Sequence, residues 1–325
     1  MFKTMVQRAI SDRIAPQRRS PESRLGEERA EMRRSLERGL DEKSNTGAGK
    51  FLGLLDPVFR GLRHGLGKIG LYERLSDRAT RFSIVERRYS FFDLPAGLEG
   101  LRILQISDPH IDSHPGFAER LASAVGKVEA DLVVLTGDYR FEVAGRPDRA
   151  LAGMRRVLDA VEPRLGTFAV LGNHDSLAMV EPLESLGAKV LLNEGHEIEV
   201  GGALLWVGGC DDPIYYRTHD VAAAMKGAPS IAFRLFLSHA PDVAEEAAGH
   251  EVDLFLCGHT HGGQVNLAPG FTLVSNSRCP RDRVRGEWRV GAMTGYTSSG
   301  VGFSGIPLRT FSRSEIVLHV LESLS

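Results

Sequence analysis

Cysteine is scarce in this sequence: 325 residues contain only Cys210, Cys257 and Cys279, with no C-x-x-C pair. This excludes a disulfide-dense secreted domain and indicates a reducing compartment. Long apolar runs are also missing, since none approaches the roughly 18 residues that a membrane-spanning helix needs. Residues 1–20 are too charged to contain the apolar core of a signal peptide. We therefore expect a cytoplasmic protein without a transmembrane helix.

Charge of one sign is not in excess, since the formal net charge is -2, but the charges are unevenly distributed. Residues 1–90 hold 20 Lys/Arg against 12 Asp/Glu, whereas residues 91–325 hold 20 Lys/Arg against 30 Asp/Glu. An acidic body argues against nucleic acid as a partner and is compatible with a cation site. A basic arm suits an anionic surface such as lipid. No obligate protein partner is evident from the sequence.

Composition divides the chain into an N-terminal extension (1–50), an amphipathic segment (51–80) and a body (81–325). The extension is rich in Arg, Glu and Ser and poor in aromatic residues, which predicts a disordered, charged segment. Within it, Glu27 to Leu40 could form no more than a transient, charged helix. The body has the composition of a folded domain.

The segment 51–80 predicts a basic amphipathic helix. Apolar residues recur at helical spacing between Phe51 and Tyr72, and Lys and Arg fall mainly between them. Two interpretations remain open. Residues 51–75 could lie on the inner face of a membrane as a peripheral contact, or their apolar stripe could dock on the body.

Apolar runs in the body alternate with helical patterns, which predicts an α/β fold. The run from Leu101 to Ile106 predicts a strand, and Asp108 and His110 follow it, separated by Pro109. Because side chains two apart on a strand share a face, we expect these two groups to converge. A carboxylate and an imidazole at this spacing supply half of a metal site.

Four later apolar runs end in the same manner. The polar blocks that follow them are Gly137-Asp138, Gly172-Asn173-His174-Asp175, His239 and Gly258-His259-Thr260-His261. Gly-Asp and Asn-His-Asp alone are ordinary turn sequences, and Gly258-His259-Thr260-His261 alone could be a single-metal or structural pair. Ligand groups gather at the carboxyl ends of strands in α/β sheets. The five blocks together therefore predict one site with several potential metal ligands.

The ordered set D-x-H, G-D, G-N-H-D, H and G-H-x-H resembles the calcineurin-like metallophosphoesterase superfamily over about residues 100–262. The stretch Gly258–Gln264 and the tail from Gly300 to Arg309 resemble its bacterial YkuE/YaeI-like branch. Pro109 departs from the pattern, where Leu or Ile is usual. The resemblance implies a four-layer α/β/β/α sandwich of two mixed β-sheets in one domain.

The resemblance also implies two divalent metal ions and assigns ligands to them. Residues matching the first metal's ligands are Asp108, His110 and His261, the bridging carboxylate matches Asp138, and the second metal's ligands match Asn173, His239 and His259. Carboxylate, amide and imidazole donors without thiolate suit Mn²⁺, Fe or Zn²⁺ better than a purely hard cation. We expect manganese first, with iron, zinc and magnesium as alternatives.

Two further residues match the family's catalytic positions. His174 resembles the non-ligand histidine that protonates the leaving group or stabilises developing charge, and Asp175 would orient it. Arg140 could contact a substrate phosphate or be a solvated arginine. Tyr215 and Tyr216 could wall the pocket or belong to an ordinary surface loop.

The sequence thus predicts hydrolysis of a phosphodiester or pyrophosphate bond. The amphipathic segment and the branch resemblance favour a lipid-linked substrate, similar to UDP-2,3-diacylglucosamine, at the cytoplasmic membrane face. A soluble phosphodiesterase or phosphatase acting on nucleotides is the first alternative. A non-catalytic scaffold is the second, although all seven expected ligands and His174 are present.

Overall fold

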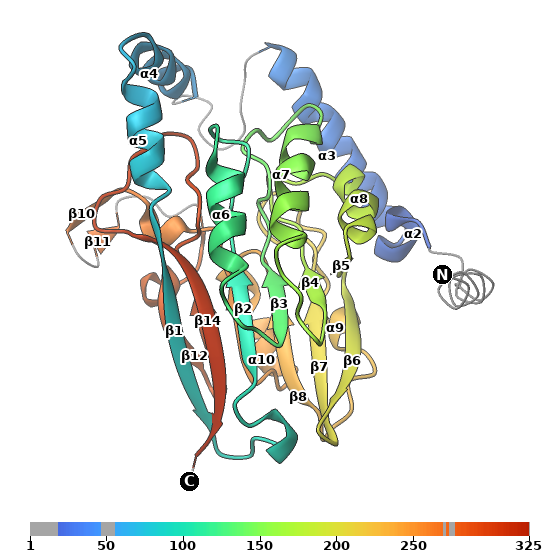
Figure 1. Ribbon diagram of the computed structural model, residues 1–325. Helices are drawn as coiled ribbons and strands as arrows, with labels where there is room; N and C mark the ends of the chain where they lie inside the picture. The colour runs from blue at the N-terminus through green and yellow to red at the C-terminus, as the bar shows by residue number, and fades with distance from the viewer. Residues whose placement is uncertain (1–18, 47–55, 269–270, 273–276, 325) are drawn as a thin grey trace, which may run out of the picture.

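A computed structural model of the chain describes residues 19–46, 56–268, 271–272 and 277–324. Twelve strands form two six-stranded sheets (Figure 1). The order of the first sheet is β1 (Phe82–Phe91), β14 (Ser314–Ser323), β2 (Arg102–Ile106), β3 (Leu132–Leu135), β4 (Thr167–Ala169) and β5 (Ala188–Val190). The order of the second is β12 (Gly286–Val290), β13 (Met293–Thr297), β9 (Leu254–Cys257), β8 (Phe233–Leu237), β7 (Ala203–Gly209) and β6 (Glu194–Val200). A small separate sheet pairs β10 (Asn266–Ala268) with β11 (Phe271–Thr272).

Both large sheets are mixed. In the first, β2, β3, β4 and β5 run parallel, while β14 is antiparallel to β2. In the second, β7, β8, β9 and β13 run parallel, with antiparallel edge strands β6 and β12. The predicted pair of mixed sheets is confirmed.

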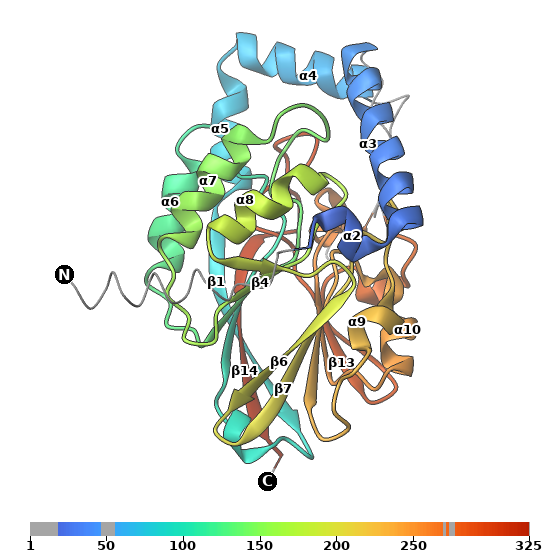
Figure 2. The same ribbon diagram turned by 90° about the vertical axis from the view of Figure 1, so that its right-hand side faces the viewer.

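Helices cover the outer faces of both sheets. Figure 2 shows α6 (Phe117–Val125), α7 (Asp148–Leu158) and α8 (Val180–Ser185) on one side of the sandwich, and α9 (Val221–Met225) and α10 (Ala244–Gly249) on the other. Short 3-10 turns complete the body: η1 (Ala96–Leu98), η2 (Leu177–Met179), η3 (Pro241–Val243), η4 (His261–Gly263) and η5 (Arg281–Arg283). These layers are the predicted four-layer α/β/β/α arrangement.

Alternation along the strands supplies three apolar layers. On β2, Ile103 packs between the sheets, whereas Leu104 packs beneath α6 and α7. On β8, Leu235 and Leu237 face the inter-sheet layer, and Phe236 faces α9 and α10. Each such side chain contributes about 1.5–3 kcal/mol when fully buried. The central strands are therefore apolar on both faces, which leaves polar residues for the strand ends.

The N-terminal extension is not disordered over its described part, and that prediction is wrong for residues 21–46. They form α2 (Pro21–Leu25) and α3 (Glu27–Thr46). Arg24 contacts Glu184 and Glu194 at 2.7 Å and 2.6 Å, which anchors α2 to the body. Composition predicted disorder because few apolar residues are present, but charged side chains with specific partners hold these helices. Residues 1–18 lie outside the described residues.

The segment 51–80 contains α4 (Asp56–Lys68) and α5 (Leu71–Ala79), while residues 51–55 lie outside the described residues. Helix α5 docks on the body, because Ala79 is buried and Tyr72 packs against the same cluster. In contrast, Leu62 is 44% exposed and Ile69 is 72% exposed. Docking therefore accounts for α5, and a membrane contact through the exposed residues stays a prediction. No described helix has both the length and the apolarity to cross a membrane.

Two strands show the limits of local pattern. Strand β6 carries Glu194, His196 and Glu197 and has no apolar run, so the sequence gives no clear strand signal there. Strand β14 is apolar, but its position between β1 and β2 joins chain segments more than 200 residues apart. Only tertiary pairing determines that position.

Candidate metal centre

The predicted polar blocks lie at the carboxyl ends of neighbouring parallel strands. In the first sheet, residues 108–110, 138 and 173–175 follow β2, β3 and β4. In the second sheet, His239 follows β8 and residues 259–261 follow β9. Since the sheets pack face to face, the five loops meet at one end of the sandwich.

The backbone of these loops is left-handed at five of the expected ligands. Their φ angles are 49° at Asp108, 40° at His110, 57° at Asp138, 72° at His259 and 51° at His261. Such angles are uncommon outside glycine and concentrate at functional sites, where the surrounding structure enforces them. The predicted reason for the convergence of Asp108 and His110, strand alternation, is wrong: both lie beyond β2, and turn geometry brings them together.

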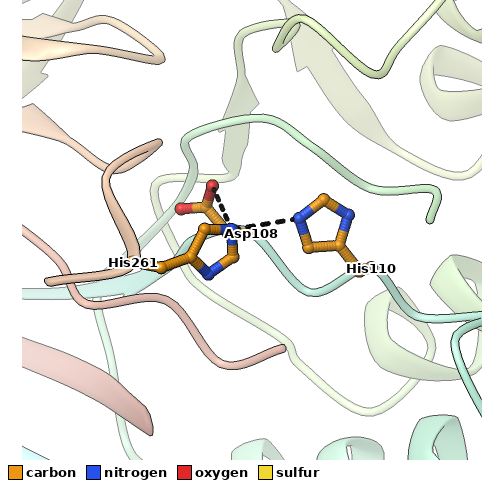
Figure 3. A group of neighbouring side chains, drawn as sticks. All are labelled: Asp108, His110 and His261. Atoms are coloured by element: carbon orange, nitrogen blue, oxygen red, sulfur yellow. Dashed lines mark hydrogen bonds and ion pairs between the residues drawn. The ribbon is translucent and has the colours of Figure 1, made fainter. Parts of the chain in front are cut away.

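The first group of ligand atoms belongs to Asp108, His110 and His261, which lie within 4.8 Å of one another. His110 Nε2 is 3.2 Å from His261 Nε2, and His261 Nε2 is 3.7 Å from Asp108 Oδ1 (Figure 3). Figure 3 shows the carboxylate and both rings directed toward one another, with Asp108 and His110 on the loop after β2 and His261 on the loop after β9. All three residues are buried.

The second group consists of Asp138, His239 and His259. His239 Nε2 lies 3.4 Å from Asp138 Oδ1 and 3.1 Å from His259 Nδ1. Asn173 Oδ1 lies 3.0 Å from His239 Nε2 and completes the group. The other oxygen of Asp138, Oδ2, is 3.7 Å from His110 Nε2, so this carboxylate lies between the two groups.

These donors fit divalent metal ions. Ring nitrogens that face one another at 3.1–3.2 Å are both acceptors, so no hydrogen bond joins them unless one of the two nitrogens holds a proton. Two ligand atoms that bind the same metal ion, each at about 2.1 Å, are separated from each other by roughly 3.0–3.4 Å. The arrangement of the two groups, with Asp138 between them, suits two ions that share one carboxylate. Which metal binds is not determined by this donor set.

Burial and neighbouring charges set the protonation of the ligands. Burial lowers the pKa of His110 to about 3, with His174 adding to the effect, and burial also lowers the pKa of His261. Burial disfavours the charge of Asp138, but His239 and His174 outweigh it and hold its pKa well below the usual range. Although burial opposes it, Asp138 raises the pKa of His239 to about 10. The first group therefore presents neutral imidazoles, the form that binds metals.

Backbone carbonyls orient three of the imidazole rings. Each ring donates Nδ1–H to a carbonyl oxygen: His110 to Arg140 (2.8 Å), His239 to Thr136 (2.8 Å) and His174 to Phe141 (2.7 Å). A carbonyl only accepts, so each ring carries a proton on Nδ1 and leaves Nε2 for the site.

Two glycines of the predicted motifs leave room for the carboxylates. A Cβ at Gly172 would lie 2.3 Å from Asp138 Oδ1. A Cβ at Gly258 would lie 2.2 Å from Asp108 Oδ2 and 1.8 Å from Ser107 Oγ. Real Cβ atoms do not approach that closely, so each glycine is required by the position of the neighbouring carboxylate.

The position of His174 suits a proton donor. Its Nε2 is 3.8 Å from Asp138 Oδ2, and its ring centre is 4.7 Å from that of His110. The predicted role of Asp175 in orienting this ring is wrong, because the ring is held by the Phe141 carbonyl. The Asp175 carboxylate instead accepts from the backbone nitrogens of Asp138, Tyr139 and Gly172 and ties two ligand loops together.

Replacing His174 with alanine is expected to lower kcat at least about 100-fold, the usual contribution of a positioned general acid. His174 also forms a group with His110 and Asp138 whose ligand atoms lie within 4.8 Å of one another, but both metal ions should remain bound because each keeps the ligands of its own group. Metal content and kcat are measured on the same preparation, with His64→Ala, an exposed histidine of α4, as the matched control. Loss of metal from His174→Ala would make His174 a ligand instead.

Two of the three predicted substrate contacts are buried and contact other parts of the protein. Arg140 is buried, and its guanidinium donates to the carbonyls of His174, Val143 and Gly145, so it braces the loop instead of facing substrate. Tyr216 is 1% exposed and packs under the Arg33 guanidinium, 3.9 Å from the ring centre. Both substrate assignments are wrong for this reason. Tyr215 is half-buried, and its role stays a prediction.

Sequence reasoning missed the roles of two arginines beside the site, the buried Arg33 and the half-buried Arg309. Arg33 donates to the Asp175 carbonyl (3.1 Å) and to both oxygens of Asp211 (2.7 and 2.9 Å). Arg309 donates to the carbonyls of Ser299 (2.8 Å) and His261 (3.2 Å). Arg33 lies in no periodic pattern or short motif, and Arg309 ends the tail that resembles the YkuE/YaeI-like branch, which assigned it no role.

A four-layer α/β sandwich with His and Asp groups at the strand ends defines a class of metal-dependent hydrolases. The family model for the calcineurin-like phosphoesterases matches residues 101–263, half of the chain. This chain therefore belongs to the calcineurin-like phosphoesterase family. Membership indicates metal-dependent hydrolysis of phosphoesters.

Curated relatives agree with this assignment. A "Transmembrane protein with metallophosphoesterase domain" from Danio rerio is 32% identical over 70% of this chain, which spans 55% of the relative's length. The "Uncharacterized metallophosphoesterase YkuE" of Bacillus subtilis is 26% identical over 71% of this chain and 82% of its own. An "Uncharacterized metallophosphoesterase" of Aquifex aeolicus is 31% identical over 69% of this chain and 86% of its own.

Proposed function

We propose that this protein hydrolyses a phosphodiester or pyrophosphate bond with two divalent cations. The observation that carries the proposal is the position of Asp138, one carboxylate between two groups of buried imidazole and carboxylate ligands. When bound, a pair of cations sharing such a carboxylate neutralises the phosphoryl oxygens and supplies a nucleophilic water at neutral pH. The ligands would be Asp108, His110 and His261 for one cation and Asn173, His239 and His259 for the other, with Asp138 shared.

His174 would supply the proton for the leaving oxygen. Its Nδ1–H is held by the Phe141 carbonyl at 2.7 Å, so a second proton can only lie on Nε2, the nitrogen beside Asp138. His174 also donates its backbone N–H to Asp138 Oδ1 at 2.8 Å, which fixes the ring and the shared carboxylate relative to each other.

The substrate we propose is lipid-linked and lies at the cytoplasmic face of a membrane, with UDP-2,3-diacylglucosamine as the model compound. Leu62 and Ile69 are exposed on α4 and on its connection to α5, and Figure 1 shows α4 beyond one end of the sandwich. Exposed apolar residues among basic ones are typical of a segment that lies in a membrane interface. The resemblance to the YkuE/YaeI-like branch supports the lipid element by analogy only.

Removal and replacement of metal tests the reaction class. Chelated protein is expected to lose hydrolysis of bis-p-nitrophenyl phosphate, and refilling with Mn²⁺, Fe²⁺, Zn²⁺ or Mg²⁺ should restore it, with Mn²⁺ best. The monoester p-nitrophenyl phosphate is assayed in parallel to separate diesterase from monoesterase activity. Two bound ions without turnover of either compound would contradict the proposal for simple esters.

The choice of substrate is tested in a second assay. With the same metal-loaded protein, UDP-2,3-diacylglucosamine should be cleaved with a higher kcat/KM than UDP-glucose or a cyclic nucleotide. A preference for the soluble nucleotides would favour the alternative of a soluble phosphodiesterase. Inactivity on every substrate, with metals bound, would favour a scaffold without catalysis.

A further inference from the structure

A cavity of about 970 Å³ lies between α5, β1 and residues 307–315. None of the ligands of the metal centre lines it. Its walls include six guanidinium groups, those of Arg78, Arg81, Arg87, Arg285, Arg309 and Arg313. Glu315 is the one acidic residue among its described lining residues. Clefts lined by charge of one sign concentrate the field and attract counter-ions.

Most of this positive charge is not neutralised within the protein. The Glu315 carboxylate accepts from Tyr296 OH (3.2 Å) and from the Ser299 backbone N–H (2.9 Å). Arg285 donates to the backbone carbonyl of Phe311 at 2.8 Å. Among the described residues, neither Arg78 nor Arg313 has an ion pair, whereas Arg81 pairs with Asp77 at 3.1 Å.

Arg309 is built into the wall that separates this cavity from the metal centre. Its Nη2 lies 3.2 Å from Nδ1 of the ligand His261 and donates to the Ser299 carbonyl. Its other partners are neutral as well, Ser312 Oγ at 3.1 Å among them. Its Nε is buried and has no hydrogen-bond partner within the described part of the chain. The charge of Arg309 is therefore held by neutral groups, and no described carboxylate pairs with it, so it adds to the positive charge around the cavity.

Apolar side chains lie on the rim of the same cavity. Leu308 is 40% exposed and Phe311 is 58% exposed, and both line it. The cavity is also bounded by Leu75 of α5, the helix that follows the exposed Ile69. A cationic cavity with an apolar rim matches a ligand that has a phosphate head and an apolar tail.

We propose that this arginine cavity binds the phosphate group of an anionic membrane lipid. Arginine suits phosphate because its planar guanidinium donates two parallel hydrogen bonds. The site is separate from the ligands of the metal centre, and binding there requires no catalysis. It goes beyond the proposed function because the lipid held in the cavity is an anchor and not the substrate. A soluble phosphate compound has the same binding chemistry and is distinguished by the test.

The test compares two double variants of the full chain. Arg285→Gln/Arg313→Gln removes two cations of the cavity, and Arg149→Gln/Arg155→Gln removes two exposed cations of α7 that do not line it. Flotation is measured with phosphatidylcholine vesicles that contain or lack phosphatidylglycerol. Each basic residue near an anionic surface contributes about 1 kcal/mol, so the cavity variant should bind the anionic vesicles roughly 30-fold more weakly. The α7 variant should bind like the unmodified chain, and thermal unfolding of both checks the fold.

Titration with sn-glycerol 3-phosphate separates the two sources of phosphate. It is carried out on metal-loaded and on chelated protein, because phosphate also binds metal ions and only the cavity should respond after chelation. Binding that needs Arg285 and Arg313, without flotation on any vesicle, would overturn the lipid source and assign a soluble phosphate compound. Equal behaviour of both double variants in both assays would overturn the site. Hydrolysis of bis-p-nitrophenyl phosphate is followed in parallel, so failure of this proposal is distinguishable from failure of the catalytic one.

Discussion

Replacing Asp138 with asparagine is expected to lower kcat about 1,000-fold or more, because a shared carboxylate that holds two cations is worth several kcal/mol in the transition state. The substitution preserves shape. Asparagine tolerates the left-handed backbone at this position, where φ is 57°. Its amide oxygen can still accept from the His174 backbone N–H, as Asp138 Oδ1 does at 2.8 Å. The expected loss therefore comes from the missing charge.

Bound metal is the measurement that separates this effect from misfolding. Asp138→Asn should bind fewer than two ions, while thermal unfolding of the chelated variant should match that of the chelated unmodified protein or exceed it. The matched control is Asp112→Asn, a half-buried aspartate whose Oδ1 accepts from the Phe141 backbone N–H at 2.7 Å. This control should keep both ions and its activity. Full activity of Asp138→Asn would rule out the shared-carboxylate assignment.

Replacing Arg33 with methionine is expected to lower the free energy of unfolding by about 3–5 kcal/mol, the usual result of removing one partner of a buried ion pair. Arg33 and Asp211 are both fully buried, and their closest atoms are 2.7 Å apart. Burial opposes the charge of Arg33, but Asp211 together with Tyr216 and Glu37 outweighs it, and the pKa of the guanidinium is raised. Methionine keeps the aliphatic stem and leaves the Asp211 carboxylate without its cation.

Urea unfolding of three variants checks this prediction. Arg34→Met is the matched control, since Arg34 is 44% exposed on the same helix and pairs with Glu31 at 3.3 Å. Its effect should stay below about 1 kcal/mol, as for other exposed pairs. Arg33→Met/Asp211→Asn should recover part of the loss, because no unpaired charge is then buried. Equal effects of Arg33→Met and Arg34→Met would show that α3 is not held by this pair.

Arg33 is also connected to the metal centre through the backbone of Asp175. It donates to the carbonyl of Asp175, whose side chain in turn accepts from Asp138 N–H and Gly172 N–H at 2.8 Å each. The N-terminal helix α3 is thereby connected to two ligand loops. Removal of the N-terminal extension would therefore disturb the metal centre as well as any membrane contact. Single substitutions are the better test of what the extension contributes.

Local sequence patterns were sufficient to predict the buried strands and the ligand groups, because each follows from a simple physical rule. The apolar runs predicted strands such as β2 and β9, because a strand buried on both faces must be apolar throughout. Polar residues immediately after those strands predicted the ligand groups, because strand ends in one sheet gather at one edge. Gly172 and Gly258 belong to the same motifs, and the close approach of the carboxylates explains why they are glycines.

What the sequence by itself determined is thus the fold class, the family and the set of candidate ligands, since each is recorded in short stretches of neighbouring residues. Only the tertiary structure decided the roles of residues whose partners are distant in the chain. Asp175 serves backbone N–H groups instead of the His174 ring, and Tyr216 lies beneath Arg33. Arg309 joins the arginine cavity to the metal centre. Hydrogen bonds and ion pairs between such residues depend on distances of a few ångströms, which no composition or spacing records.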